Sequence, residues 1–157
     1  MTFAQSRKPV HNRIVNLRHL LDHSGVEEVL EMRGRFGFMA FHGGSLEERT
    51  DLVARTAAER SGASYYGVHQ PTGLRQHVPS HRFTGDQSQS LAEFLEHVDV
   101  VITVHGYGRR GLFTTMLLGG GNRDLAAHVA PHLRRALPAY LVEDDIEQIP
   151  KELRGLH

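Results

Sequence analysis

The sequence predicts an α/β fold, a mostly parallel, twisted open sheet with helices on both faces. Short apolar runs over 36–41 and 99–105 show no alternation, which is typical of strands buried on both faces. Helix-length patterns separate these runs, and two of them begin with a Ser-x-x-Glu capping box. Strands that alternate with helices favour a parallel sheet. Because 157 residues fit one compact domain, we expect a single catalytic-type domain over 1–157.

The first half of the chain predicts one strong strand, one helix and two weaker strands. We expect them over 36–41, from about 45 to 62, over 65–69 and over 77–83 respectively. Gly43-Gly44 ends the first strand, and Ser45 with Glu48 can form the capping box that begins the helix. A turn over 71–73 would join the two weaker strands.

The second half repeats the alternation of helices and strands. We expect a capped helix over 90–97, a strand over 99–105, an apolar run over 112–118, a helix over 122–136 and a strand over 139–143. Asn122 is a suitable N-cap for the later helix, which Pro131 is expected to kink or divide. The order β, helix, β therefore recurs through the chain.

The composition narrows the chemistry of any site. Lys plus Arg equals Asp plus Glu at 18 each, which predicts no nucleic acid or membrane partner. There is no cysteine, so histidine and carboxylate are the strong zinc ligands that remain. The N-terminus has no uninterrupted apolar region typical of a signal peptide. We expect a cytoplasmic monomer.

Two histidines stand where two predicted strands end. His42 follows the first apolar run and His105 ends the second, and a glycine follows each. Ligands of open α/β sheets bind beyond the carboxyl ends of the strands. Glu47 lies in the first helical turn and is expected to turn back toward His42, because Glu48 would be used by the capping box.

Two histidines and one glutamate, with a position left for water, form an established catalytic zinc set. The sequence therefore predicts Zn²⁺ held by His42, Glu47 and His105. Each residue alone also fits an ordinary structural role, since a histidine at a strand end is commonly hydrogen-bonded and the helix dipole favours an early glutamate.

Four segments resemble the poly-γ-glutamate hydrolase family, a group of small phage and bacterial zinc enzymes. They are, in order, FMAFHGGSLEERTDLVA, HVPSHRF, VITVHGYG and LLGGGN, within roughly residues 36–125. The resemblance implies a sheet similar to that of zinc carboxypeptidases and zinc at His42, Glu47 and His105. It also implies cleavage of γ-glutamyl amide bonds of poly-γ-glutamate. A phage-encoded member would be released by lysis.

The chain departs from the family pattern near its C-terminus. Members resemble one another there in a GVQLEL strand whose glutamate is the general base by analogy with zinc carboxypeptidases, and no such segment precedes His157. We expect this strand and its base to be lacking. A general base contributes ~10²–10⁴-fold, so metal would bind but turnover would be slow. The acidic run over 143–145 is an alternative source of a base.

Arginine matches the α-carboxylates of poly-γ-glutamate because its planar fork binds a carboxylate by two hydrogen bonds. His77 and Arg82 fall on matched family positions and are predicted substrate contacts. Arg109 and Arg110 follow His105 and are further candidates, although paired arginines in a glycine-flanked loop are commonly solvated. Two other functions fit: a related zinc amidase or carboxypeptidase acting on cell-wall peptides, and a non-catalytic metal-binding domain.

Overall fold

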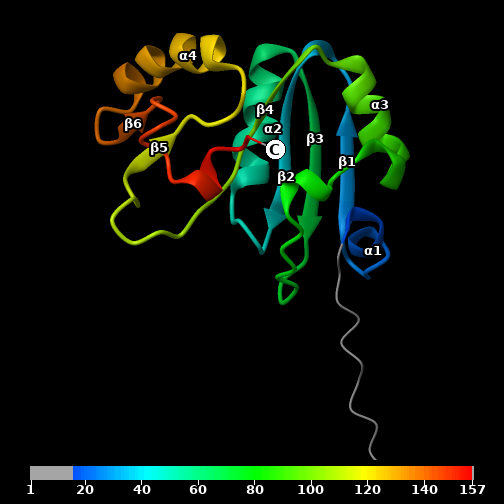
Figure 1. The fold of residues 1–157 in the computed structure, drawn as a ribbon. Coiled ribbons are helices and arrows are strands. Elements are labelled where there is room, and N and C mark those ends of the chain that lie inside the picture. The colour runs from blue at the N-terminus through cyan, green and yellow to red at the C-terminus, as the bar shows by residue number, and fades with distance from the viewer. Residues whose placement is uncertain (1–15, 157) are drawn as a thin grey trace, which may run out of the picture. The chain divides into compact units, whose positions relative to one another are not determined.

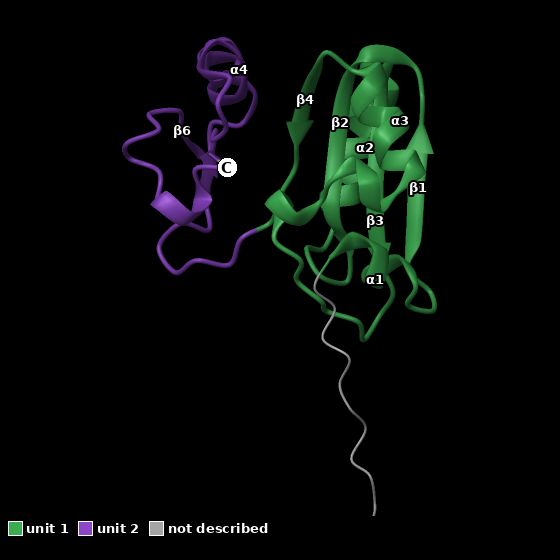
Figure 2. Cartoon of the chain, turned by 45° about the vertical axis from the view of Figure 1, so that its right-hand side comes forward, with its two compact units in different colours: residues 1–106 green, residues 107–157 purple. Residues whose placement is uncertain are grey.

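The computed structural model describes residues 16–156, and the chain divides into two compact units, Met1–Gly106 and Tyr107–His157 (Figure 2). The expectation of a single domain stays a prediction. Within residues 16–156, no helix is both long and apolar enough to cross a membrane.

Unit 1 is built on a four-stranded sheet (Figure 1). Its strands, in spatial order, are β1 (Glu27–Glu31), β3 (Ala63–Gln70), β2 (Gly34–Gly44) and β4 (Val100–Thr103). β2 runs parallel to both β3 and β4, and only β1 is antiparallel to its neighbour β3. The predicted mostly parallel α/β sheet is confirmed.

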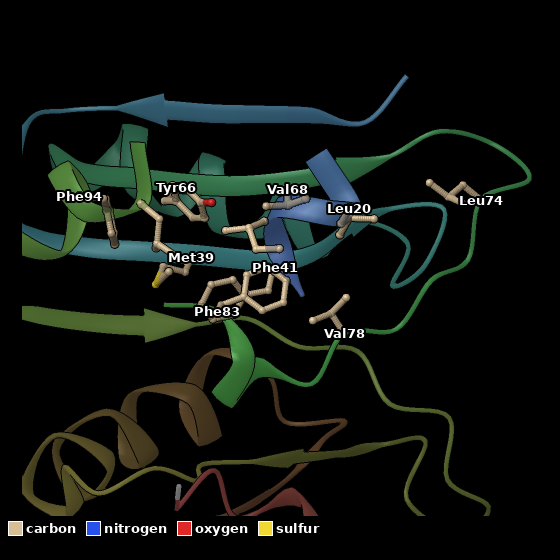
Figure 3. Packing of buried hydrophobic residues seen from close by; sticks show 11 residues of the cluster. Leu20, Met39, Phe41, Tyr66, Val68, Leu74, Val78, Phe83 and Phe94 are labelled. Atoms are coloured by element: carbon tan, nitrogen blue, oxygen red, sulfur yellow. The ribbon is translucent and has the colours of Figure 1, made fainter. Parts of the chain in front are cut away.

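Helices cover both faces of this sheet. The helices are α1 (Leu17–Leu21), α2 (Thr50–Ser61) and α3 (Gln89–His97). Successive residues of β2 point to opposite faces, so Ala40 packs in one cluster with Ala54 and Ala58 of α2. Met39 packs in the other cluster with Phe94 of α3 and residues of α1 (Figure 3). These two apolar layers are the core of unit 1.

The start of α2 differs from the prediction. The helix begins at Thr50, and its N-cap residue Arg49 has a left-handed backbone with φ 71° and no side-chain cap. The Ser45 hydroxyl instead donates to the carbonyls of Pro71 (2.8 Å) and Leu74 (2.5 Å). The predicted capping box is therefore wrong, because a loop distant in sequence uses the serine hydroxyl.

The segment predicted as a strand over 77–83 contains a single turn of 3₁₀ helix, Ser80–Arg82, and no strand. Val78 and Phe83 are buried on either side of this turn in the larger core cluster. The apolar residues of the segment therefore anchor a loop rather than a strand. Likewise, α3 is capped by Ser88, whose hydroxyl accepts from the N–H of Leu91, and not by Ser90.

Strand β1 escaped prediction because three of its five residues are glutamates. One of them, Glu28, is placed where its carboxylate accepts hydrogen bonds from the hydroxyls of Tyr66 (2.7 Å) and Ser88. These contacts satisfy a charge that lies beside the core. They also tie β1 to β3 and to the start of α3.

Unit 2 contains β5 (Thr115–Leu117), α4 (Arg123–Ala136) and β6 (Leu141–Glu143). β5 and β6 pair in parallel, and α4 connects them, as the sequence predicts. The Asn122 side chain accepts from the N–H of Leu125 at 3.0 Å, so the predicted N-cap is confirmed. Pro131 lies inside α4 without dividing it, so the expected division of this helix is wrong.

Candidate metal centre

His42 lies near the carboxyl end of β2, and a β-bulge sets its direction. The register of β2 against β3 shifts between Ala40 and Gly43, where β2 carries an extra residue. As a result, two consecutive rings approach the same neighbour. The Phe41 and His42 ring centroids lie 4.3 Å and 6.0 Å from that of Phe83. The bulge thus allows His42 to be almost fully buried at the strand end, with 1% of it exposed.

Glu47 is carried by the tight loop between β2 and α2. Its N–H donates to the His42 carbonyl at 2.9 Å, and its own carbonyl accepts from the Thr50 hydroxyl at 2.8 Å. The loop begins at Gly44, where φ is 71° and an added Cβ would lie 2.2 Å from the carbonyl oxygen of Gln70. Only glycine fits this approach, so the backbone brings Glu47 back beside His42.

The Glu47 carboxylate lies between two imidazoles. Its Oε1 is 2.8 Å from Nδ1 of His42, and its Oε2 is 3.4 Å from Nδ1 of His105. The backbone N–H of Gly106 also donates to Oε2 at 2.9 Å. The structure therefore brings together the three residues predicted as metal ligands, from the end of β2, the following loop and the loop just beyond β4.

The environment keeps Glu47 ionised. Desolvation raises the pKa of this carboxyl, but hydrogen bonds with His105, His42 and the Gly106 N–H outweigh it and lower the pKa to about 2. The side chain is only 13% exposed. The reason for choosing Glu47 over Glu48 also changes. Glu48 is exposed and takes part in no capping box, whereas Glu47 is selected by the contacts of its carboxylate.

The surroundings of His42 fit a bound cation. Its Nε2 lies 2.8 Å from the Val78 carbonyl, which can only accept, so this nitrogen carries a hydrogen. Nδ1 faces the Glu47 carboxylate, so it donates to this acceptor when it carries a hydrogen and offers a lone pair beside it when it does not. In the second state a divalent metal ion can bind the imidazole lone pair and the carboxylate together.

A third imidazole, that of His77, stands beside the other two. Its ring centroid is 4.7 Å from that of His42, and the ligand atoms of His42, Glu47 and His77 all lie within 4.8 Å of one another. Desolvation lowers the pKa of His77, and the neighbouring His42 lowers it further. Sequence reasoning placed His77 among substrate contacts. His77 lies in a loop, and the spacing of residues in the sequence does not predict that this loop brings the imidazole beside the carboxylate.

Comparison with known proteins bears on this geometry. A model of a family described as poly-gamma-glutamate hydrolase matches residues 22–157. The chain belongs to this family. The resemblance seen in the sequence is confirmed, and the match includes every candidate site residue of this family member. No curated protein and no solved structure matches the chain.

The other predicted substrate contacts of this poly-γ-glutamate hydrolase family member lie on loops. Arg82 ends the 3₁₀ turn of unit 1 and is exposed. Arg109 and Arg110 belong to unit 2, where Arg109 forms an ion pair with Glu152. Their contact with substrate stays a prediction. In the acidic run over 143–145, the Asp144 carboxylate pairs with Arg134 at 2.5 Å.

Proposed function

We propose that this chain is a zinc-dependent hydrolase that cleaves γ-glutamyl amide bonds of poly-γ-glutamate by metal-activated water. Membership of the poly-γ-glutamate hydrolase family supports the reaction and the substrate. The observation that carries the metal is the Glu47 carboxylate, whose two oxygens face Nδ1 of His42 and Nδ1 of His105. A set of two histidines and one glutamate is typical of catalytic zinc.

In this proposal His42, Glu47 and His105 hold the zinc. When bound, zinc lowers the pKa of a coordinated water to ~7 and polarises the carbonyl of the amide bond. Gly106 fixes the Glu47 carboxylate through its backbone N–H, so the ligand needs little rearrangement. His77 and His105 are both exposed, and the ligand atoms of His77 lie within 4.8 Å of those of His42 and Glu47. We assign the third ligand to His105, whose Nδ1 faces Oε2 of Glu47 at 3.4 Å, and give His77 a contact with the substrate.

Recognition of the polymer would rest on cationic and hydrogen-bonding side chains. Each residue of poly-γ-glutamate carries a free α-carboxylate, and arginine binds carboxylates through paired N–H groups. The proposed contacts are His77, Arg82, Arg109 and Arg110. Removing one contact should therefore raise KM while the zinc content stays unchanged.

Measurement of bound zinc tests the metal site. Elemental analysis of the purified chain should give about one zinc per chain, and His42→Ala and His105→Ala should lose it. His77→Ala should keep it. Full zinc content in both His42→Ala and His105→Ala would refute the ligand set, and loss in His77→Ala in place of His105→Ala would make His77 the third ligand.

A matched control comes from α4. His128 and His132 lie one helical turn apart on an exposed face, with ring centroids 5.3 Å apart, so they can bind metal weakly at the surface. The double variant His128→Ala/His132→Ala removes two histidines that are not in the proposed ligand set. It should keep both the tightly bound zinc and the activity. Because it lacks the surface pair, the zinc measured per chain in this variant does not include metal bound there.

Hydrolysis is tested by the release of short oligomers from poly-γ-glutamate. Release should stop on treatment with EDTA and return on addition of Zn²⁺. Cleavage of cell-wall peptides in preference to poly-γ-glutamate would establish a related zinc amidase instead. Normal zinc binding without hydrolysis of either substrate would refute the proposed activity and leave a metal-binding domain.

A further inference from the structure

We propose that the His77–Ser80 segment orients both metal-binding imidazoles and that the Ser80 hydroxyl is the positioning residue for His105. This inference rests on the proposed zinc site and deepens it. The segment is part of a loop. Its polar groups face Nε2 of each imidazole, whereas Glu47 faces Nδ1. Three contacts carry the argument, one for each histidine and one for the segment itself.

The first contact is to His42. The Val78 carbonyl accepts from Nε2–H of this imidazole at 2.8 Å, so Nδ1 is the nitrogen that carries the lone pair in the neutral ring. A carbonyl in this position selects the tautomer and also fixes the plane of the ring. Carboxylates and backbone carbonyls commonly play this part behind the histidine ligands of metals.

The second contact is to His105. The Ser80 hydroxyl lies 3.5 Å from Nε2 of this imidazole, while Nδ1 faces Glu47 at 3.4 Å. The arrangement repeats that of His42, with the ε-nitrogen facing the segment and the δ-nitrogen facing the carboxylate. When Ser80 accepts from Nε2–H, the lone pair of a neutral His105 imidazole is also on Nδ1.

The third contact anchors the segment. Val78 is fully buried in the larger core cluster, and Phe83, just beyond the 3₁₀ turn, is buried in the same cluster (Figure 3). The Phe83 ring also lies beside those of Phe41 and His42. The segment is therefore held by packing on both sides of Ser80, and its polar groups are preorganised with little freedom to move.

The matched variants Ser80→Thr and Ser80→Val test the inference, because threonine and valine have nearly the same shape and differ in the hydroxyl. Zinc affinity is measured by competition with a chelator, and the visible spectrum of the Co²⁺-substituted protein reports the geometry of the ligands. Ser80→Thr should stay close to wild type. Ser80→Val should still bind zinc but ~10–100-fold more weakly, with an altered Co²⁺ spectrum.

A serine outside the segment provides the control. Ser61 donates to a carbonyl of its own helix, and Ser61→Ala should leave both readouts unchanged. Equal zinc affinity and equal Co²⁺ spectra in Ser80→Thr and Ser80→Val, with tight binding in wild type, would refute the positioning role alone. Absence of zinc binding in wild type would refute the proposed function, and the positioning role with it.

Discussion

Replacing Phe83 with leucine separates the stability of unit 1 from the geometry of its candidate metal centre. Phe83 is 7% exposed, and its ring centroid lies 4.3 Å from that of Phe41 and 6.0 Å from that of His42. The substitution keeps an apolar side chain but removes three carbons from behind the imidazole. We expect both a loss of stability and a weaker metal site.

The size of the first effect follows from the carbons removed. At ~0.8 kcal/mol for each buried carbon, Phe83→Leu should lower the free energy of unfolding by ~2 kcal/mol. Phe94→Leu is the matched control. Phe94 is fully buried in the same cluster, and its ring centroid lies 5.8 Å from that of Tyr66. Within residues 16–156, the rings beside His42 are those of His77, Phe83 and His105.

Urea unfolding of the metal-free proteins measures the stability, and chelator competition measures zinc affinity. Both variants should lose a similar free energy of unfolding. Only Phe83→Leu should also bind zinc more weakly, by ~10-fold, because it alone loosens the packing of a proposed ligand and of the segment proposed to orient it. Equal zinc affinity in the two variants would contradict the role of Phe83 in holding His42.

Two further predictions concern stability away from the centre. Desolvation raises the pKa of Glu31, but hydrogen bonds from two arginines outweigh it and hold the pKa below its ordinary value. Glu31 therefore stabilises the fold at pH values above its unfolded-state pKa and loses the effect as pH falls through its folded-state pKa. In urea unfolding, Glu31→Gln should lower the free energy of unfolding by about 1 kcal/mol at pH 7 and by much less at pH 3. The exposed control Glu59→Gln should lower it less at pH 7. A loss in Glu31→Gln that does not change with pH would contradict the ion-pair explanation. Arg49→Gly should raise the free energy of unfolding by about 1 kcal/mol, since φ is 71° there. Arg60→Gly, inside α2, should lower it, and a loss of stability in both variants would exclude backbone strain at Arg49.

The elements that could be predicted are those whose pattern is local. β2 and β4 are continuous apolar runs, and α4 has a side-chain cap at Asn122, so each carries its own signal. β1 could not be predicted in this way. Its glutamates resemble a solvated surface until Tyr66 and Ser88, which are distant in sequence, donate to Glu28.

For the candidate centre, the sequence by itself determined the residue types and two of their positions. His42 and His105 each follow an apolar run, and the carboxyl ends of neighbouring parallel strands meet at one edge of a sheet, so their proximity could be expected. The absence of cysteine left histidine and carboxylate as the ligands. These conclusions need only chain order and periodicity.

The tertiary structure decided which atoms of the candidate ligands face one another and what holds them. Glu47 is the candidate ligand because the Gly106 N–H and two imidazoles meet its carboxylate, and the predicted cap on Glu48 plays no part. The Val78 carbonyl and the Ser80 hydroxyl come from a loop predicted as a strand. Such contacts join groups far apart in the chain through the packing of a buried core, and no local pattern of residues encodes that packing.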